Sequence, residues 1–238
     1  DGFVRGEAAF KQTHPTAKIE YNLDIRIPEL MTPDVYKSRI EWLTPPSSAK
    51  RVDILRNFIK QNNELVGINN QQIDDLKVAA DYTNPDGNLS YVHLEQKFNN
   101  IPVFRGEVKA GFTNDGRIIR VINNLAPGVD AGTVSRNFNN PVDAVRIAAQ
   151  HIKHEIRPAD VTKNEAESND LRTVFGSGDW ATTAEKMYFP TEPGIAVPSW
   201  RVLIWRPVNA YYVIVDAQTG IVLWHKNISD DQTQSATY

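Results

Sequence analysis

Three short segments that alternate between apolar and polar residues, joined by two tight turns, constrain this fold more than any other feature of the sequence. The segments are residues 89–98, 101–112 and 117–124. Asn99 and Asn100 both tolerate a positive φ, so they predict a two-residue hairpin turn between the first two segments. The Asp-Gly pair at 115–116 is a still stronger hairpin signal. The sequence therefore predicts an antiparallel three-strand meander.

Upstream of the meander, the periodicity of the apolar residues changes from two to that of a helix. It predicts a helix over 48–61 with Ser47 or Ser48 as its N-cap, and a second short helix within 69–83. The apolar face of the first helix consists of Val52, Leu55, Phe58 and Ile59. Residues 1–46 are predicted to form an N-terminal arm with one weak strand at 19–27.

Downstream, residues 125–135 are small and turn-rich, which is typical of a linker. A helix is predicted over 140–156, with Asn140 as its cap and Pro141 at its first position. Residues 157–180 are polar and are predicted to form a long loop. The last third alternates well in three segments, residues 199–208, 210–217 and 220–228. We therefore expect an α+β fold in two modules, each an antiparallel sheet packed with helix.

Composition excludes several classes of function. The chain has 238 residues, a net charge of −3 and a pI near 6.0, which gives no basic footprint for nucleic acid. It has no cysteine, so disulfides and Cys-type zinc sites are excluded. No apolar run approaches the roughly 18 residues of a membrane span.

Candidate catalytic motifs are few. The zincin signature H-E-x-x-H is absent; the nearest pattern is His151 and His154 at i, i+3, which we interpret as a helix-surface pair rather than a metal site. The Gly-Ser-Gly at 176–178 does not meet the G-x-S-x-G elbow and is interpreted as a loop. The sequence therefore predicts no catalytic residue, no metal and no cofactor.

The C-terminal strands carry an aromatic stripe, which consists of Trp200, Trp205, Tyr211, Tyr212 and Trp224. Aromatic residues on alternating strands usually fill the space between a sheet and a helix. We interpret the stripe as core, with Trp205 and Tyr211 as possible exceptions that face a ligand.

The meander resembles the fungalysin/thermolysin propeptide motif. The matching residues are His93, Gln96, Ile101, Pro102, Val103, Phe104, Gly106, Asp115 and Gly116. Asn100 stands where the family usually has glycine, and asparagine also accepts a left-handed φ. The C-terminal helix and strands resemble a PepSY domain, in which Asp216, Thr219 and Gly220 form the turn.

The resemblance implies a division of the chain into an N-terminal arm at 1–46, a propeptide-like domain at 47–130, a PepSY-like domain at 138–228 and a C-terminal junction at 229–238. The implied fold is cystatin-like and PepSY-like. The implied function is that of the pro-region of a secreted, fungalysin-type zinc metalloendopeptidase, which acts as an intramolecular chaperone and inhibitor. The chain would then be extracellular, with its signal peptide already removed, and its partner would be the cognate catalytic domain beyond Tyr238, acted on in cis or in trans.

A docking element is expected at the first corner of the meander, where the chain turns, stiffens at a proline and reaches Gly106, which permits a β-bulge or a close approach. Pro102 is expected at a strand start or an edge because it cannot donate to a ladder. The expected partner-binding residues are Asn100, Ile101, Pro102, Val103, Phe104, Arg105 and Gly106. The alternative is that these residues only stabilise the meander.

Two other classes of function remain open. The chain could be a free-standing secreted module that binds or inhibits a protease, or a structural subunit of an extracellular assembly that self-assembles by exchanging the arm at 1–46. Two N-glycosylation sequons begin at Asn88 and Asn227 and matter only in a eukaryotic secretory route.

Overall fold

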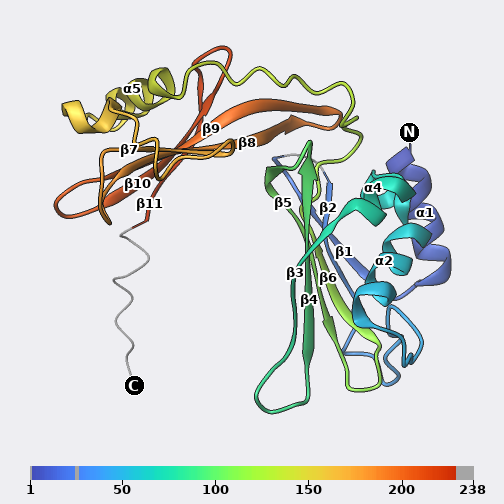
Figure 1. The fold of residues 1–238 in the computed structure, drawn as a ribbon. Coiled ribbons are helices and arrows are strands. Elements are labelled where there is room, and N and C mark those ends of the chain that lie inside the picture. Colours follow the sequence, from blue (N-terminus) through green and yellow to red (C-terminus); the bar gives the residue numbers. More distant parts are fainter. Residues whose placement is uncertain (1, 25–26, 229–238) are drawn as a thin grey trace. The chain divides into compact units, whose positions relative to one another are not determined.

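The computed structural model describes residues 2–24 and 27–228 (Figure 1). The described chain divides into two compact units. Among the described residues, the first consists of 2–24 and 27–132 together with 190–196, and the second of 133–189 together with 197–228. The junction predicted at 229–238 lies outside the described residues. The two-module α+β fold expected from the sequence is confirmed in its class.

The first unit contains a six-strand antiparallel sheet in the order β1-β2-β6-β5-β4-β3. Its strands are β1 (Lys18–Asn22), β2 (Ile27–Thr32), β3 (Lys77–Thr83), β4 (Ser90–Phe98), β5 (Ile101–Phe112) and β6 (Ile118–Asn123). The predicted meander is confirmed as β4 to β6, because the alternation of apolar residues places one face of each strand on the core.

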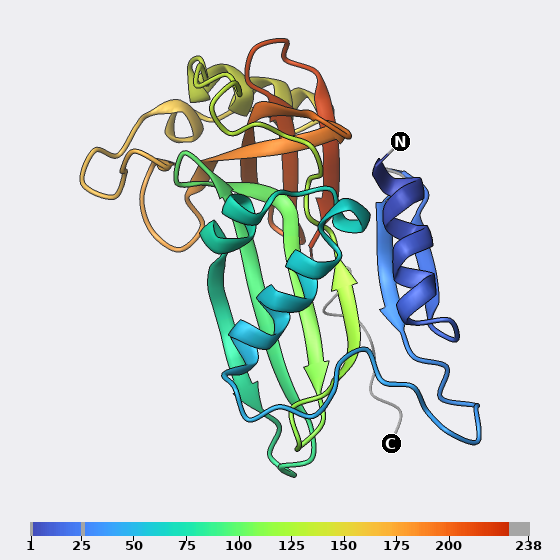
Figure 2. The ribbon, with the colours of Figure 1, turned by 90° about the vertical axis from the view of Figure 1, so that its right-hand side faces the viewer.

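One face of this sheet is covered by helices, and α2 crosses the strands diagonally (Figure 2). The helices of the first unit are α1 (Gly2–Thr13), α2 (Arg51–Gln61), α3 (Asn63–Val66) and α4 (Asn70–Asp75). The core between helices and sheet contains Leu55, Phe58 and Leu94, none of them more than 2% exposed. It also contains Phe10 and Met31, so residues 1–46 contribute buried side chains to this unit.

Three local expectations for the first unit differ from the structure. Helix α2 begins at Arg51 with Lys50 as N-cap, whereas the Ser47 side chain accepts a hydrogen bond from the Ala49 N–H. The second short helix ends at Asp75, because residues 77–83 pair with β4 instead. The single strand expected at 19–27 is a pair of strands, β1 and β2.

The second unit is built from one helix and a strand-rich region. Helix α5 (Pro141–His151) has Asn140 as its side-chain N-cap and Pro141 at its first position, as expected. The 3₁₀ turn η1 spans Pro158–Val161. The strands are β7 (Arg172–Phe175), β8 (Thr182–Glu192), β9 (Ile195–Trp205), β10 (Ala210–Asp216) and β11 (Val222–Asn227), adjacent in that order.

The region at 157–180 was predicted to be a long loop, but it holds η1 and β7, and β8 follows directly. Strand β8 was not predicted from the sequence, because its buried residues come in groups rather than in strict alternation. The turn at Gly176 and Gly178, both with positive φ, joins β7 to β8, so this part of the loop interpretation holds.

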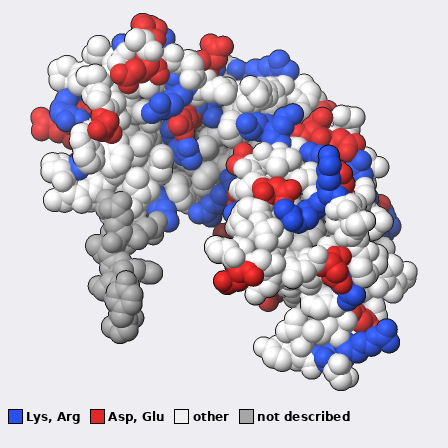
Figure 3. Space-filling model, turned by 60° about the horizontal axis from the view of Figure 1, so that its bottom comes forward, with Lys and Arg blue, Asp and Glu red and all other residues white. Residues whose placement is uncertain are grey.

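Lys and Arg are interspersed with Asp and Glu on the face shown in Figure 3. No helix within residues 2–24 and 27–228 is both long and apolar enough to cross a lipid bilayer.

Candidate functional site

The turn that starts the candidate docking element has the backbone geometry that the sequence predicted. Asn99 and Asn100 have φ angles of 52° and 65°, the two positive values that a type I′ turn requires. Phe98 pairs with Ile101 across the turn, and Lys97 pairs with Pro102. Pro102 is therefore the second residue of β5, at the strand start, where its missing N–H is tolerated.

Directly after this turn, β5 leaves the regular ladder. Lys97 pairs with Pro102, but Glu95 pairs with Glu107, so Gln96 alone stands opposite the four residues 103–106. This is an extended β-bulge, and Arg105 within it has a φ of 52°. The bulge separates the predicted site residues into a buried set and a set that reaches the surface.

The buried set consists of Ile101, Val103 and Gly106, and the first two are 8% and 6% exposed. Asn100 and Arg105 are exposed, whereas Pro102 and Phe104 are half-buried. The Arg105 guanidinium carbon lies 5.2 Å from the centroid of the Phe104 ring, within the range of a cation–π contact. The seven residues thus follow one another through the turn, the start of β5 and the bulge, but only four of them present surface to a partner.

Gln96 is the residue that stands opposite the bulge, and in the sequence it was noted only as a match to the motif. Its side chain is buried, its Nε2 donates to the Ala126 carbonyl at 3.2 Å, and its Oε1 accepts from the Ala126 N–H at 2.8 Å. Both polar atoms of a buried amide are thereby satisfied. The sequence did contain an indication of this buried role: a glutamine stands at an inward-facing position of an alternating strand, between Leu94 and Phe98.

Gly106 is required by the close packing inside the bulge. A Cβ at this position would lie 2.7 Å from the Val103 Cβ and 3.1 Å from the Gln96 Oε1. The first distance is shorter than real Cβ contacts allow, so a side chain would force the bulge open. A bulge or a close approach was expected at this glycine from the sequence, and the geometry agrees with that interpretation.

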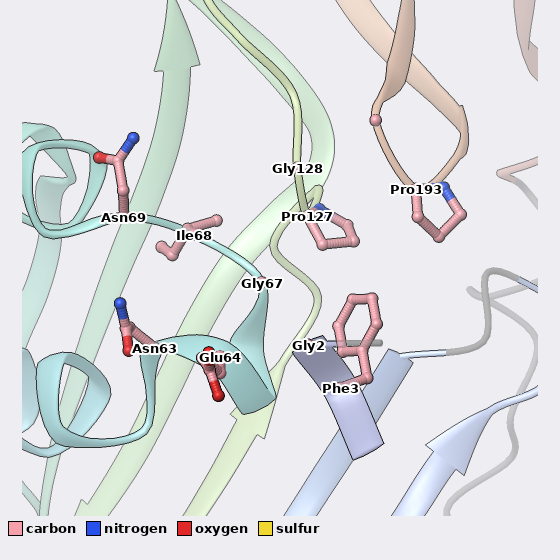
Figure 4. A pocket seen from close by; sticks show the side chains of 11 residues that line it. Gly2, Phe3, Asn63, Glu64, Gly67, Ile68, Asn69, Pro127, Gly128 and Pro193 are labelled. Carbon is pink, nitrogen blue, oxygen red and sulfur yellow. The ribbon is translucent and has the colours of Figure 1, made fainter. Parts of the chain in front are cut away.

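The first unit also has a cavity of about 450 Å³ beside the loops that follow α3 and β6 (Figure 4). The Gly67 carbonyl accepts from Gly128 N–H at 2.7 Å, and the Pro127 carbonyl accepts from Gly194 N–H at 2.8 Å. The cavity is lined by Gly2, Phe3, Asn63, Glu64, Gly67, Ile68, Asn69, Pro127, Gly128, Pro193 and Gly194. The Glu64 carboxylate in its wall already pairs with Arg5 at 3.0 Å.

The histidines of the predicted surface pair have different partners in the second unit. His154 Nε2 lies 3.3 Å from Asp160 Oδ2, whereas His151 Nε2 lies 3.1 Å from His225 Nδ1. Among the described residues, no group of three or more His, Cys, Asp or Glu side chains is placed to hold a metal ion.

Asp160 is a buried carboxylate with several hydrogen-bond donors. It is 3% exposed and accepts hydrogen bonds from the Arg157 N–H at 2.9 Å, from the Arg157 guanidinium and from the Thr182 hydroxyl. Burial by itself raises the pKa of Asp160, but the hydrogen bonds from Arg157, Thr182 and His154 outweigh it and hold that pKa well below its usual range. The cluster joins η1 to the start of β8.

The aromatic stripe is partly core. Trp200 is 3% exposed, and its Nε1 donates to the Phe138 carbonyl. Trp205, Tyr211, Tyr212 and Trp224 are half-buried, and the Trp205 ring lies 4.8 Å from the ring of Trp180. The interpretation as core therefore holds fully for Trp200 alone.

Comparisons with known proteins agree with this architecture over part of the chain. The family model for the Fungalysin/Thermolysin Propeptide Motif matches residues 74–125, which run from the end of α4 through β6. The resemblance stated from the sequence is thereby confirmed for the motif. The matched region is a propeptide motif and not a catalytic domain.

Two relatives are extracellular metalloproteinases from Aspergillus. The chain is 26% identical over 149 residues to extracellular metalloproteinase NpIII of Aspergillus oryzae, and 25% identical over 149 residues to extracellular metalloproteinase mep of Aspergillus flavus. Each match covers 60% of this chain and 23% of the relative. The match thus spans about a quarter of each of these relatives.

A solved structure, the Bacillus megaterium YpeB C-terminal domain, matches with a TM-score of 0.33 and 10% identity. It covers 94% of this chain and 96% of that one. A TM-score this low carries no argument about fold or function.

Proposed function

We propose that this chain is the pro-region of a secreted zinc metalloendopeptidase, which assists the folding of the catalytic domain and inhibits it until cleavage. The observation that carries the proposal is the match of the propeptide motif to residues 74–125, the part of the chain that forms β3 to β6. The two Aspergillus relatives, both extracellular metalloproteinases matched over 23% of their length, support it.

The division into domains is part of the same proposal. The propeptide-like domain would span 47–130, and a PepSY-like domain would span 138–228. The helix α5 and strands β9 to β11, with the tight turn at Gly220 between the last two, support the second assignment. Secretion and a cognate catalytic domain as partner follow from the proposed role.

The bulge on β5 is the proposed docking element. Asn100, Pro102, Phe104 and Arg105 present surface, and the buried Ile101, Val103 and Gly106 fix their positions. A contact of standard size would bury on the order of 1,600 Å² in total, so the bulge would be one part of a larger interface. Its rigidity lowers the entropy lost on binding, because few side chains must be ordered.

The first test of the function is the coding sequence beyond residue 238. An H-E-x-x-H helix in the same reading frame supports a pro-region that acts in cis, and its absence contradicts that role. The encoded catalytic domain is then refolded from denaturant with and without this chain. We expect at least a tenfold gain in active enzyme, followed by inhibition at equimolar chain; no gain and no inhibition would overturn the proposal.

A double variant tests the docking element. Phe104→Ala with Arg105→Ala removes both surface side chains, so we expect the inhibition constant to rise at least tenfold with an unchanged unfolding midpoint. The matched control is Arg146→Ala with Ile156→Ala, an exposed arginine and an exposed apolar residue of the second unit. Equal inhibition by both double variants would remove the bulge from the interface.

A further inference from the structure

The helix-free face of the first-unit sheet carries a row of side chains that the core does not use. The helices lie on the opposite face (Figures 1 and 2). Across four strands, Tyr82 pairs with Tyr91, Tyr91 with Gly111, and Gly111 with Arg120. These four residues therefore form a line perpendicular to β3, β4, β5 and β6.

Gly111 makes this line a groove. An added Cβ at Gly111 would meet nothing closer than the Tyr91 ring at 3.7 Å, so the space above its backbone is open. Hollows of about 330 Å³ and about 320 Å³ flank the row, and Tyr91, Gly111 and Arg120 line both of them. The glycine thus leaves a low passage between the two hollows.

One hollow is cationic. Arg120 is exposed and makes no hydrogen bond or ion pair with any residue in 2–24 or 27–228. His93 Nε2 and Lys109 Nζ, in the next row, each lie 2.7 Å from the carboxylate of Glu107. The Glu107 carboxylate pairs with two of these three basic side chains, and the Arg120 guanidinium is left unmatched.

The other hollow is largely apolar. It is lined by Pro33, Val35, Leu89 and Ile119 in addition to the shared residues, and Val35 is 52% exposed. At the far end of the row, the Tyr82 and Tyr91 rings stack with their centroids 5.3 Å apart, and Tyr82 is 54% exposed. Exposed apolar and aromatic side chains beside an unpaired arginine are typical of protein-binding surfaces.

We propose that this groove binds an acidic peptide segment of a partner protein. A carboxylate of the segment pairs with Arg120, the chain crosses Gly111 beside the Tyr91 ring, and an apolar side chain enters the hollow at Val35. A guanidinium donates two parallel hydrogen bonds to a carboxylate, which fixes the orientation of the segment. This inference stands apart from the pro-region role, because it specifies the chemistry of the bound segment and not the protein that carries it.

A peptide fits this groove better than a single-stranded nucleic acid does. Nucleic acid binding needs several phosphate contacts, and this groove offers one unmatched cation in a chain of net charge −3. An apolar hollow suits an aliphatic side chain, whereas a nucleotide offers chiefly phosphate, sugar and planar base surfaces.

The test is an NMR titration of the full chain with a defined probe. The probe is a nine-residue peptide, blocked at both ends, with two glutamates flanking one leucine in a glycine and serine background. Its matched control has glutamines in place of the glutamates. We expect saturable shifts at the amides of Tyr91, Gly111 and Arg120, with at least fivefold weaker binding of the glutamine peptide and weakening at higher salt.

Variants of the chain complete the test. Arg120→Gln removes the cation and Gly111→Leu fills the passage without changing charge, so each should weaken the glutamate peptide at least fivefold. Arg146→Gln, which changes the same charge on α5, should leave the affinity unchanged. Equal binding of the two peptides, shifts confined to other surfaces, no shifts at 5 mM probe (about the weak limit for such a site), or tighter binding of an eight-nucleotide oligothymidine would each overturn the proposal.

Discussion

Gln96 in the first unit and Asp160 in the second are both buried polar side chains, 4% and 3% exposed, but they are satisfied in different ways. Gln96 is a neutral amide that exchanges two hydrogen bonds with the backbone of one residue, Ala126. Asp160 is a charged carboxylate that accepts from the side chains of Arg157, Thr182 and His154.

The difference shows two ways to hold an irregular segment in place. The neutral amide ties β4 opposite the bulge to the segment after β6, and this link does not depend on pH. The Asp160 carboxylate accepts hydrogen bonds from several donors and so links η1 to β8. This link has its full strength only while the carboxylate is ionised. The four predictions below test this contrast, from the largest expected effect to the smallest.

Removal of the carboxylate should have the largest effect. Asp160→Ala leaves the buried Thr182 hydroxyl and the Arg157 N–H without an acceptor, so we expect a loss of about 3 kcal/mol in the free energy of unfolding. Tryptophan fluorescence in urea measures it, because four of the five tryptophans lie in the second unit. The control is Asp170→Ala on the surface, and a loss equal to that control would show that the cluster is not stabilising.

The second-largest loss of stability is expected from a substitution at Gly106, which would fill the space beside Gln96. Gly106→Ala places a Cβ 2.7 Å from the Val103 Cβ, so we expect a loss of about 2 kcal/mol from overpacking. The matched control is Gly111→Ala on the same strand, where the nearest atom would be 3.7 Å away. Circular dichroism in urea compares the two variants. If both cost the same, strand propensity and not the bulge geometry would explain the result.

The third effect is the pH dependence of stability, which should involve Asp160 but not Gln96 and should be smaller. The pKa of Asp160 is lowered in the folded state, so its contribution is present above the unfolded pKa near 4 and is lost as pH falls toward the folded pKa. Between pH 7 and pH 3 we expect the wild type to lose about 1 kcal/mol more than Asp160→Asn does. Gln96→Met should not alter the pH dependence. A wild-type curve parallel to that of Asp160→Asn would contradict the assignment.

The smallest expected effect is a gain in stability. Arg105 has a φ of 52°, a conformation that glycine adopts without strain, so Arg105→Gly should stabilise the chain by about 0.5 kcal/mol. Lys109→Gly, at a regular exposed position of the same strand, should destabilise it by a similar amount. Thermal unfolding measures both. A loss of stability in Arg105→Gly would show that the side chain contributes more than its backbone strain costs.

The prediction from sequence was strongest where local chemistry decides the structure. Asn99 and Asn100 specified a turn through their tolerance of positive φ, and Asn140 with Pro141 specified the start of α5. It failed where pairing decided the structure. Residues 77–83 continued a helical pattern but form a strand, and β8 was missed because its buried residues do not alternate.

For the candidate site, the sequence predicted the segment but not which of its residues are buried and which are exposed. It indicated residues 100–106 as one element and Gly106 as a position of close approach. Which of the seven residues are buried depends on a bulge opposite Gln96, which is a feature of strand pairing. Gln96 itself bonds to Ala126, which lies 30 residues away. The groove at Gly111 and Arg120 likewise depends on the pairing of four strands.

The sequence alone determined the turns, the helix α5, the alternating faces of the meander and the resemblance to a propeptide motif, because each of these depends on neighbouring residues. Only the tertiary structure decided that the buried Gln96 amide, opposite the bulge, bonds to Ala126 and that the Asp160 carboxylate links η1 to β8. Their hydrogen-bond partners come from distant positions in the chain, and long-range pairing leaves no periodic signal in the sequence.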